Sequence, residues 1–300
     1  MTRSLAWKLL LDYYPQNQAI RESTVQRKRE EYLELANGYF SINKKKEMSS
    51  YEESSLKQII LDVKRTGMEE MFQMNVIKDI MVRILFIWTI RHPASGYVQG
   101  INDLLVPFIL VIIVEHLDQD KSDSYAIREE EVEALSKDQL DQLEADAYWC
   151  LSKIIEDIQD NYTDLQPGVS KVLAKMKRIV ECSDKVLAQH LEERGINYMD
   201  FAYRWITCYL MREFSIFQIV RLWDTYLSEE EGFAEFHCYV CAALLLTFAT
   251  DIKQMNYQDC ILFLQSLPTA KWKEEDLGML MAKSYELKQF YHFNVHLFNS

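Results

Sequence analysis

The sequence predicts an all-α fold, and three observations support this prediction. Only 8 of the 300 residues are glycine and 5 are proline, whereas β-hairpins need these residue types at their turns. No segment alternates cleanly between hydrophobic and polar residues, as a half-buried strand would. Hydrophobic residues instead recur with helical spacing, most clearly at Ile77, Ile80, Met81, Ile84 and Leu85. Long helices with few tight turns are therefore expected.

The N-terminal part begins with a short apolar helix that Pro15 stops. A polar second helix follows, and Gly38 is suited to end it. Ser41–Ser55 is polar, contains three consecutive lysines and is interpreted as a mobile loop. The last helix of this part is apolar nearly all round, so it should lie at the centre of the protein. The predicted helices are Trp7–Tyr13, Thr24–Asn37, Asn75–Arg91 and Gln99–His116.

An acidic segment, Asp118–Glu144, separates an N-terminal part (1–117) from a C-terminal part (145–300), and we interpret it as an insertion with part of a helix. In the C-terminal part, Asp184 and Ser215 are suited to cap helices because their side-chain oxygens can accept hydrogen bonds from the first helical N–H groups. The predicted helices here are Ala145–Ile158, Val169–Glu181, Lys185–Glu193, Met199–Arg212, Ile216–Leu227, Phe236–Ala249, Tyr257–Ser266 and Glu274–Leu287.

Charge and motifs argue against several classes of function. The net charge of −13 disfavours non-specific nucleic-acid binding and purely electrostatic attachment to anionic membranes. It is compatible with a protein partner that has a basic face. The phosphate-binding patterns GxxxxGK[ST] and GxGxxG are absent, as are HExxH and GxSxG. The sequence therefore predicts neither a nucleotide-binding fold nor a hydrolase with its own nucleophile.

Targeting and redox signals point to a soluble, cytosolic protein. The apolar run Leu104–Val114 is interrupted by Pro107 and is too short to span a bilayer, which takes about 20 residues. Residues 1–14 lack the features of a signal peptide. The six cysteines need no disulfide framework in a chain of this length.

Two patterns resemble metal sites, and a structural interpretation is favoured for each. Cys238-x-x-Cys241 beside His237 is half a zinc or redox site, but the sequence contains no second Cys or His pair. Asp118–Glu129 follows the spacing of a calcium loop, with Asp123 where the sharp turn calls for glycine. Buried thiols, a solvated acidic loop and no metal are expected.

Three short patterns in the N-terminal half combine polar and charged residues. RxxxW spans Arg3–Trp7, and IxxDxxR spans Ile59–Arg65, where the carboxylate and the guanidinium can share one face of a helical turn. YxQG spans Tyr97–Gly100 and opens the most apolar helix, closely followed by Asn102 and Asp103. A polar cluster is thus expected at the exposed start of a buried helix.

These three patterns, in this order, are the fingerprints of the TBC-domain Rab GTPase-activating proteins, a family that the chain resembles from residue 1 to about residue 285. The Gln166–Gly168 and Met211–Phe214 stretches and the acidic insertion most resemble a Golgi-associated subgroup. The resemblance implies two helical subdomains that form a cleft. It also implies a cytoplasmic, Golgi-associated protein whose N-terminal targeting region is absent or lies outside this sequence. Flanking stretches that agree are Leu10–Pro15, Arg83–Pro93, Gly96–Leu104, Arg221–Ser228 and Phe263–Ala270.

The resemblance implies that Arg65 is an arginine finger supplied in trans, and that Gln99 is a second finger that orients the attacking water. GTP hydrolysis needs stabilised charge on the transferring phosphoryl group and a positioned water, and an arginine finger typically contributes ~10³–10⁵ in rate. An amide both donates and accepts hydrogen bonds, which suits it to align water. The resemblance also implies that the protein needs no cofactor of its own, because a Rab-type GTPase in its GTP form would hold GTP and magnesium.

Other residues are assigned supporting roles. Asp62 is expected to hold Arg65 ready before the partner arrives, and Tyr97, Asn102 and Asp103 to shape the floor of the partner groove. One departure from the family pattern concerns Gly67-Met68, where the family usually has a proline. Glycine is expected to loosen the approach of Arg65. Four residues are interpreted as structural packing signatures: Arg3, Trp7, Trp223 and Asp224.

Two alternatives come from other functional classes. A noncatalytic helical adaptor that binds GTPases or trafficking proteins would be indicated by the loss of a finger, and both fingers are present. A plain α-solenoid scaffold would show internal repeats, and the sequence has none. A monomeric GTPase activator that associates at most peripherally with membranes is therefore expected.

Overall fold

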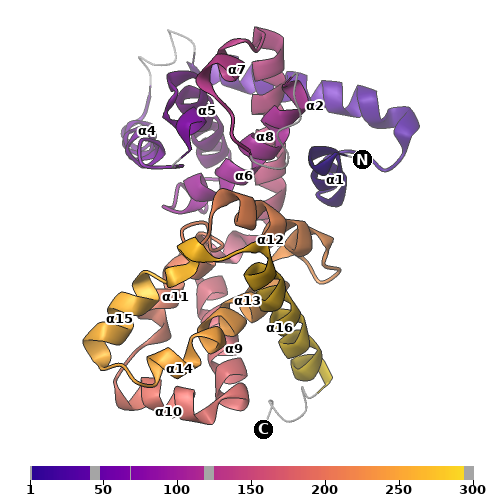
Figure 1. The fold of residues 1–300 in the computed structure, drawn as a ribbon. Coiled ribbons are helices and arrows are strands. Elements are labelled where there is room, and N and C mark those ends of the chain that lie inside the picture. The colour runs from indigo at the N-terminus through magenta and orange to yellow at the C-terminus, as the bar shows by residue number, and fades with distance from the viewer. Residues whose placement is uncertain (1, 41–47, 68, 118–124, 294–300) are drawn as a thin grey trace. The chain divides into compact units, whose positions relative to one another are not determined.

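A computed structural model of the chain describes residues 2–40, 48–67, 69–117 and 125–293. Every regular element in these ranges is a helix and none is a strand, which confirms the all-α prediction (Figure 1). The contacts divide the chain into two compact units, Met1–Thr163 and Asp164–Ser300.

The first unit is built around helix α6. All of its residues are buried, and it packs against α8, α5 and α4. The sequence-predicted central helix is thereby confirmed, with Pro107 accommodated inside it. The elements of this unit are α1 (Arg3–Leu10), α2 (Gln18–Phe40), α4 (Ser50–Val63), η1 (Glu70–Gln73), α5 (Asn75–Arg91), α6 (Ile101–Ile113), η2 (Val114–His116), α7 (Glu129–Glu133), α8 (Lys137–Ile158) and η3 (Gln159–Asn161).

Helix α8 belongs to this first unit. Its N-cap is Ser136, whose side chain accepts a hydrogen bond from the backbone N–H of Gln139 at 3.2 Å. The inward face of α8 packs against α6, α5 and α2. The contacts therefore divide the chain after Thr163, whereas the sequence-based division starts the C-terminal part at residue 145.

The loop predicted over Ser41–Ser55 is wrong in its second half. Residues 41–47 lie outside the described residues, but α4 begins at Ser50. The Ser49 hydroxyl accepts a hydrogen bond from the N–H of Glu52 at 3.2 Å, and the Glu52 carboxylate accepts one from the N–H of Ser49 at 2.7 Å. Such a capping box starts a helix within a segment that looks like a loop by polarity alone.

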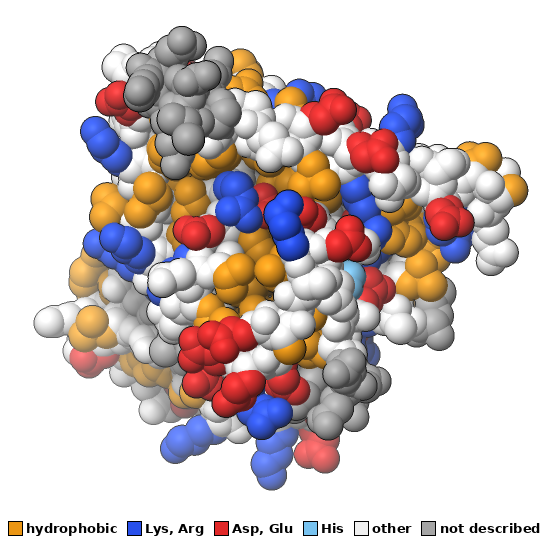
Figure 2. Space-filling model, turned by 90° about the horizontal axis from the view of Figure 1, so that it is seen from above, with side chains coloured by type: hydrophobic (Ala, Val, Ile, Leu, Met, Phe, Trp, Pro, Cys, Tyr) orange, Lys and Arg blue, Asp and Glu red, His pale blue; other side chains and the backbone are white. Residues whose placement is uncertain are grey.

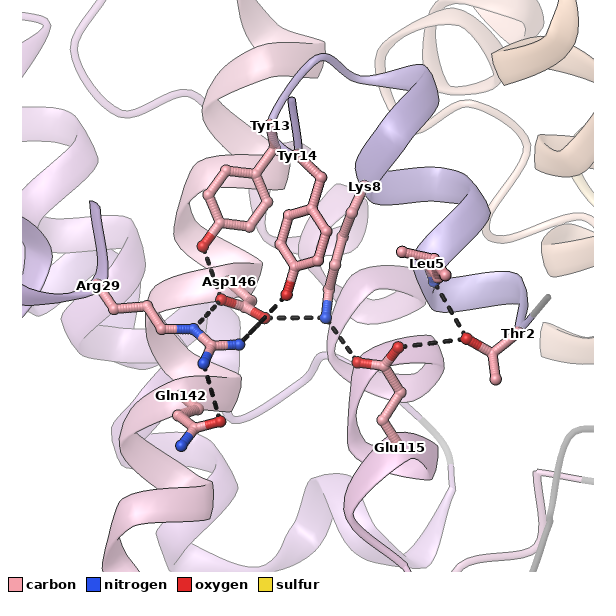
Figure 3. A network of polar contacts seen from close by, with 9 residues as sticks. All are labelled: Thr2, Leu5, Lys8, Tyr13, Tyr14, Arg29, Glu115, Gln142 and Asp146. Atoms are coloured by element: carbon pink, nitrogen blue, oxygen red, sulfur yellow. Dashed lines mark hydrogen bonds and ion pairs between the residues drawn. The ribbon is translucent and has the colours of Figure 1, made fainter. Parts of the chain in front are cut away.

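A buried charged network joins α1 and α2 to α8 (Figure 3). Lys8 is only 1% exposed, and its Nζ lies 2.8 Å from Asp146 and 2.6 Å from Glu115. Asp146 is fully buried and also accepts hydrogen bonds from Tyr13 and Arg29, each at 2.7 Å. Burial alone would raise the pKa of Asp146, but the hydrogen bonds from Arg29 and the charge of Lys8 outweigh it and lower that pKa.

The second unit is built around α13, which packs against α16, α9, α12 and α11. The predicted caps are confirmed, since Asp184 accepts from the N–H of Leu187 at 2.9 Å and Ser215 from that of Gln218 at 3.4 Å. Its elements are α9 (Pro167–Ser183), α10 (Lys185–Glu193), α11 (Tyr198–Thr207), α12 (Ile216–Ser228), α13 (Phe233–Thr247), α14 (Ala249–Ile252), α15 (Tyr257–Gln265), η4 (Pro268–Lys271) and α16 (Glu274–Phe293).

Cys238 and Cys241 are free and buried in α13, as predicted. Burial raises the pKa of Cys238 to about 12. The adjacent His237 uses both ring nitrogens, with Nδ1 2.9 Å from the Tyr226 hydroxyl and Nε2 3.0 Å from the Trp205 carbonyl oxygen. The neutral ring satisfies both contacts, because the hydroxyl donates to Nδ1 while Nε2–H donates to the carbonyl. Most of the calcium-like pattern, 118–124, lies outside the described residues.

We expect His237 to make the fold sensitive to acid. Burial lowers its pKa to about 3, whereas in the unfolded chain it protonates near 6.5. Only the unfolded state gains the proton between these values, so stability falls as the pH drops through that window. Between pH 7 and pH 5 this amounts to about 2 kcal/mol. Urea unfolding at both pH values should show this extra loss for the wild type relative to His237→Gln, and equal losses would contradict it.

Acidic side chains gather on part of the face shown in Figure 2, beside exposed hydrophobic side chains. Helix α7 contributes exposed Glu129, Glu130 and Glu133 to the acidic surface of the protein. Within the described ranges, no helix combines the length and apolar character needed to cross a bilayer.

Candidate functional site

Arg65 lies in the turn that follows α4. Its backbone N–H donates to the carbonyl oxygen of Asp62 at 2.9 Å, which continues the last helical turn. The side chain is exposed, and among the described residues its guanidinium has no hydrogen bond or ion pair. The chain thus fixes the backbone of Arg65 while its charged group stays available to a partner.

Gln99 lies in the loop between α5 and α6. Its side chain is exposed and makes no hydrogen bond within the described part of the chain. The next residue, Gly100, is buried and has φ +114°, a conformation that residues with a Cβ rarely adopt. Gly100 therefore lets the loop turn sharply into the buried helix α6 and leaves the Gln99 amide at the surface.

Asn102 connects the two loops. It is 1% exposed, and its Oδ1 accepts a hydrogen bond from the N–H of Gly100 at 3.0 Å. Its Nδ2 donates to the Thr66 hydroxyl at 2.8 Å, and that hydroxyl donates to the Asp62 carbonyl oxygen at 2.7 Å. One amide therefore holds Gly100, the residue after Gln99, and Thr66, the residue after Arg65.

A second connection runs through Asp62 and Tyr97. The Tyr97 hydroxyl lies 3.0 Å from the Asp62 carboxylate and 3.1 Å from Asn102 Oδ1. Gln58 also donates to the Asp62 carboxylate, at 3.1 Å. The described partners of this carboxylate are thus Tyr97 and Gln58. Asp62 supports Arg65 through its backbone carbonyl, and not through the side-chain contact that the sequence suggested.

The residues predicted to shape the floor of the partner groove are mostly interior, and so is Asp62, which was predicted to hold Arg65. Asp62, Asn102 and Asp103 are buried and Tyr97 is half-buried. In this structure they form the support beneath the two exposed side chains. Sequence reasoning missed Thr66, and the only signal for it was a small hydroxyl residue directly after the IxxDxxR pattern.

Of the remaining predicted residues, Trp7 and Trp223 are buried, whereas Arg3 and Asp224 are half-buried. Trp7 is buried and meets Phe108 edge-on, with ring centroids 5.8 Å apart. Arg3 donates a hydrogen bond to the Tyr125 hydroxyl and lies 5.8 Å from the centroid of that ring. In the second unit, Trp223 is buried and packs edge-on against Phe233 at 5.0 Å, while the neighbouring Asp224 is half-buried.

The two exposed side chains define what this site can do chemically. A guanidinium stabilises negative charge, and a neutral amide can donate to one group while accepting from water. No group of three His, Cys, Asp or Glu residues is placed to hold a metal ion in the part of the chain that the structure describes. The arrangement therefore suits the presentation of two polar groups to a phosphate bound elsewhere.

Comparison with known proteins finds relatives of one family over most of the chain. The family model for the Rab-GTPase-TBC domain matches residues 1–253. TBC1 domain family member 22A of Macaca fascicularis is 42% identical over 95% of this chain, and the GTPase-activating protein gyp1 of Schizosaccharomyces pombe is 40% identical over 96%. The chain spans about half the length of these curated relatives, 56% and 55% respectively.

Solved structures show the same similarity. The crystal structure of the Ypt/Rab-GAP domain of Gyp1p superposes with a TM-score of 0.90 at 38% identity, covering 96% of this chain and 88% of that one. A Chlamydomonas flagellar RabGAP TBC domain matches with a TM-score of 0.57 at 16% identity, over 94% of this chain and 90% of that one. This second likeness supports the fold alone.

Proposed function

The chain belongs to the Rab-GTPase-TBC domain family, and from this premise we propose that it accelerates GTP hydrolysis by a Rab-type small GTPase. The observation that carries the proposal is the pairing of an exposed Arg65 with an exposed Gln99 on two loops that Asn102 joins. Both side chains are accessible while their backbones are held by buried hydrogen bonds.

The proposed mechanism assigns one task to each side chain. Arg65 reaches the transferring phosphoryl group and stabilises the charge that develops on it, and Gln99 orients the attacking water. The partner holds GTP and magnesium, so this chain supplies no cofactor. Because the loops are fixed before the partner binds, little ordering of the backbone remains for the encounter.

The setting in which this activity operates is part of the proposal. We propose a monomer that acts in the cytoplasm on the GTP form of its partner at Golgi membranes, with only peripheral membrane contact. The support is the resemblance of Gln166–Gly168 and Met211–Phe214 to a Golgi-associated subgroup, together with the acidic surface described above.

The test is phosphate release from a panel of GTP-loaded Rab proteins. The wild type should accelerate a subset of them, and Gln99→Ala should lower the stimulated rate roughly 10²-fold or more, the usual cost of losing one positioned polar group. Gln189→Ala is the matched control, because Gln189 is an exposed glutamine of α10 in the other unit. Failure of the folded wild type to accelerate any Rab would contradict the proposal and favour a noncatalytic adaptor.

A further inference from the structure

We propose that Gly67, Phe72 and Gln73 form a clamp that positions Arg65 for catalysis. The inference rests on the function proposed above. It assigns the clamp residues a positioning role, since they hold the turn that carries Arg65 while the guanidinium itself remains free to meet the partner.

The first part of the clamp is the close approach of Gly67 to a ring. Gly67 has φ +70°, in the left-handed region that favours glycine. A methyl group at this position would lie 2.6 Å from Cγ and 2.7 Å from Cβ of Phe72. Proline is excluded as well, because its ring fixes φ near −65°. No other residue type fits here without displacing either the turn or Phe72.

Phe72 has little room to move. It lies in η1, is 0% exposed and follows the equally buried Met71. Its N–H donates to the Glu69 carbonyl oxygen at 3.0 Å, and η1 packs against both α5 and α7. A ring enclosed in this way acts as a fixed wall against Gly67.

The second part of the clamp is a hydrogen bond to the Gly67 backbone. Gln73 is exposed, and its Nε2 donates to the Gly67 carbonyl oxygen at 3.1 Å. Its Oε1 accepts from Lys78 Nζ, also at 3.1 Å, which orients the amide. Gly67 is thus held by the ring and by the amide, while Thr66 is held by Asn102.

This arrangement reverses the expectation that glycine loosens the approach of Arg65. A flexible residue type is used here because the turn requires its left-handed conformation, and the neighbouring side chains then restrain it. The rigidity that a proline would give through its ring arises from Phe72 and Gln73. Arg65 is therefore presented from a backbone fixed on both sides of Thr66.

The kinetic test uses Gln73→Ala and Gly67→Ala with the GTPase that the wild type activates best. Gln73→Ala is expected to lower kcat about 5- to 10-fold, the effect of one hydrogen bond. Gly67→Ala, which must shift the turn, is expected to lower it roughly 10²-fold, in line with the sensitivity of catalysis to misplaced groups. The control variant is Gln26→Ala, because Gln26 is an exposed glutamine of α2 that donates a hydrogen bond to Glu30. The KM and the unfolding midpoint of Gln73→Ala should match those of this control.

A second readout does not depend on activity. Trypsin cuts after exposed basic residues, so cleavage of the native protein after Lys64 or Arg65 reports on the opening of this turn. Both clamp variants should be cut several-fold faster there than the wild type and Gln26→Ala. Faster cleavage combined with an inactive wild type would support the clamp and refute the proposed function. Unchanged cleavage and unchanged kcat in Gln73→Ala, with an active wild type, would overturn the clamp.

Discussion

Replacement of Arg65 by alanine is expected to lower the stimulated rate of GTP hydrolysis by about 10³- to 10⁵-fold, the usual contribution of an arginine finger. Arg65 is exposed and has no side-chain hydrogen bond among the described residues, so the fold should not change. Arg65→Lys should recover little of the loss, because lysine keeps the charge but lacks the planar fork of donors. Phosphate release under single-turnover conditions measures both effects.

The control for this prediction is Arg194→Ala. Arg194 is likewise an exposed arginine directly after a helix, in this case α10. Its replacement by alanine should leave the rate of GTP hydrolysis unchanged. Full activity in Arg65→Ala, with a wild-type unfolding curve, would remove Arg65 from the proposed mechanism. A loss shared equally by Arg194→Ala would point to non-specific electrostatics.

The largest effect on stability is expected from Asp146→Ala, at about 3–5 kcal/mol of the free energy of unfolding. Asp146 is fully buried, and its removal leaves Lys8 without one partner and Arg29 without its main carboxylate. Lys8 would then keep only the Glu115 carboxylate, and the mostly buried Arg29 would keep only neutral partners such as Gln142. Urea unfolding at pH 7, followed by helical circular dichroism, gives the difference from the wild type.

Asp141→Ala provides a matched control on the same helix. Asp141 pairs with Lys137, which is 91% exposed, and such surface pairs contribute about 0–1 kcal/mol. If Asp146→Ala does not fold, Lys8→Met tests the same network from the other side, because it leaves Asp146 with its bonds from Arg29 and Tyr13. The idea of a stabilising network fails if Asp146→Ala costs no more than Asp141→Ala.

Helices with strong local signals could be predicted from the sequence. The predicted limits of α5 (Asn75–Arg91) and α10 (Lys185–Glu193) coincide with those in the structure. In α5 an apolar face repeats with helical spacing, and in α10 a capping Asp184 precedes the first turn. Both signals lie within the element itself, so they can be read without knowledge of its neighbours.

Elements that depend on distant residues were predicted less well. The helix predicted to run to Arg212 ends at Thr207, because Tyr209 and Leu210 adopt φ +48° and +61°. Neither residue type favours this conformation, and nothing local announces it. The ring of Tyr209 instead stacks on the ring of His237, with the ring centroids 4.3 Å apart. Only the folded chain provides this contact.

In the candidate site, too, features with a local sequence signal could be predicted, whereas contacts between distant residues could not. The polar cluster around Tyr97 and Asn102 was expected at the exposed start of the buried helix. It lies at that start, but Asn102 and Asp103 are buried. The roles given to Arg65 and Gln99 came from the family resemblance. The bond between Thr66 and Asn102 could not be predicted, because the two residues are 36 positions apart and neither carries an unusual pattern of its own.

The shared amide of Asn102 has a consequence for protein engineering. Because one side chain serves both loops, a change of sequence in either loop can disturb the other. A chimera that imports the segment around Arg65 has to keep partners for Tyr97 and Asn102 at positions 62 and 66, or the hydrogen bonds that join the two segments are lost.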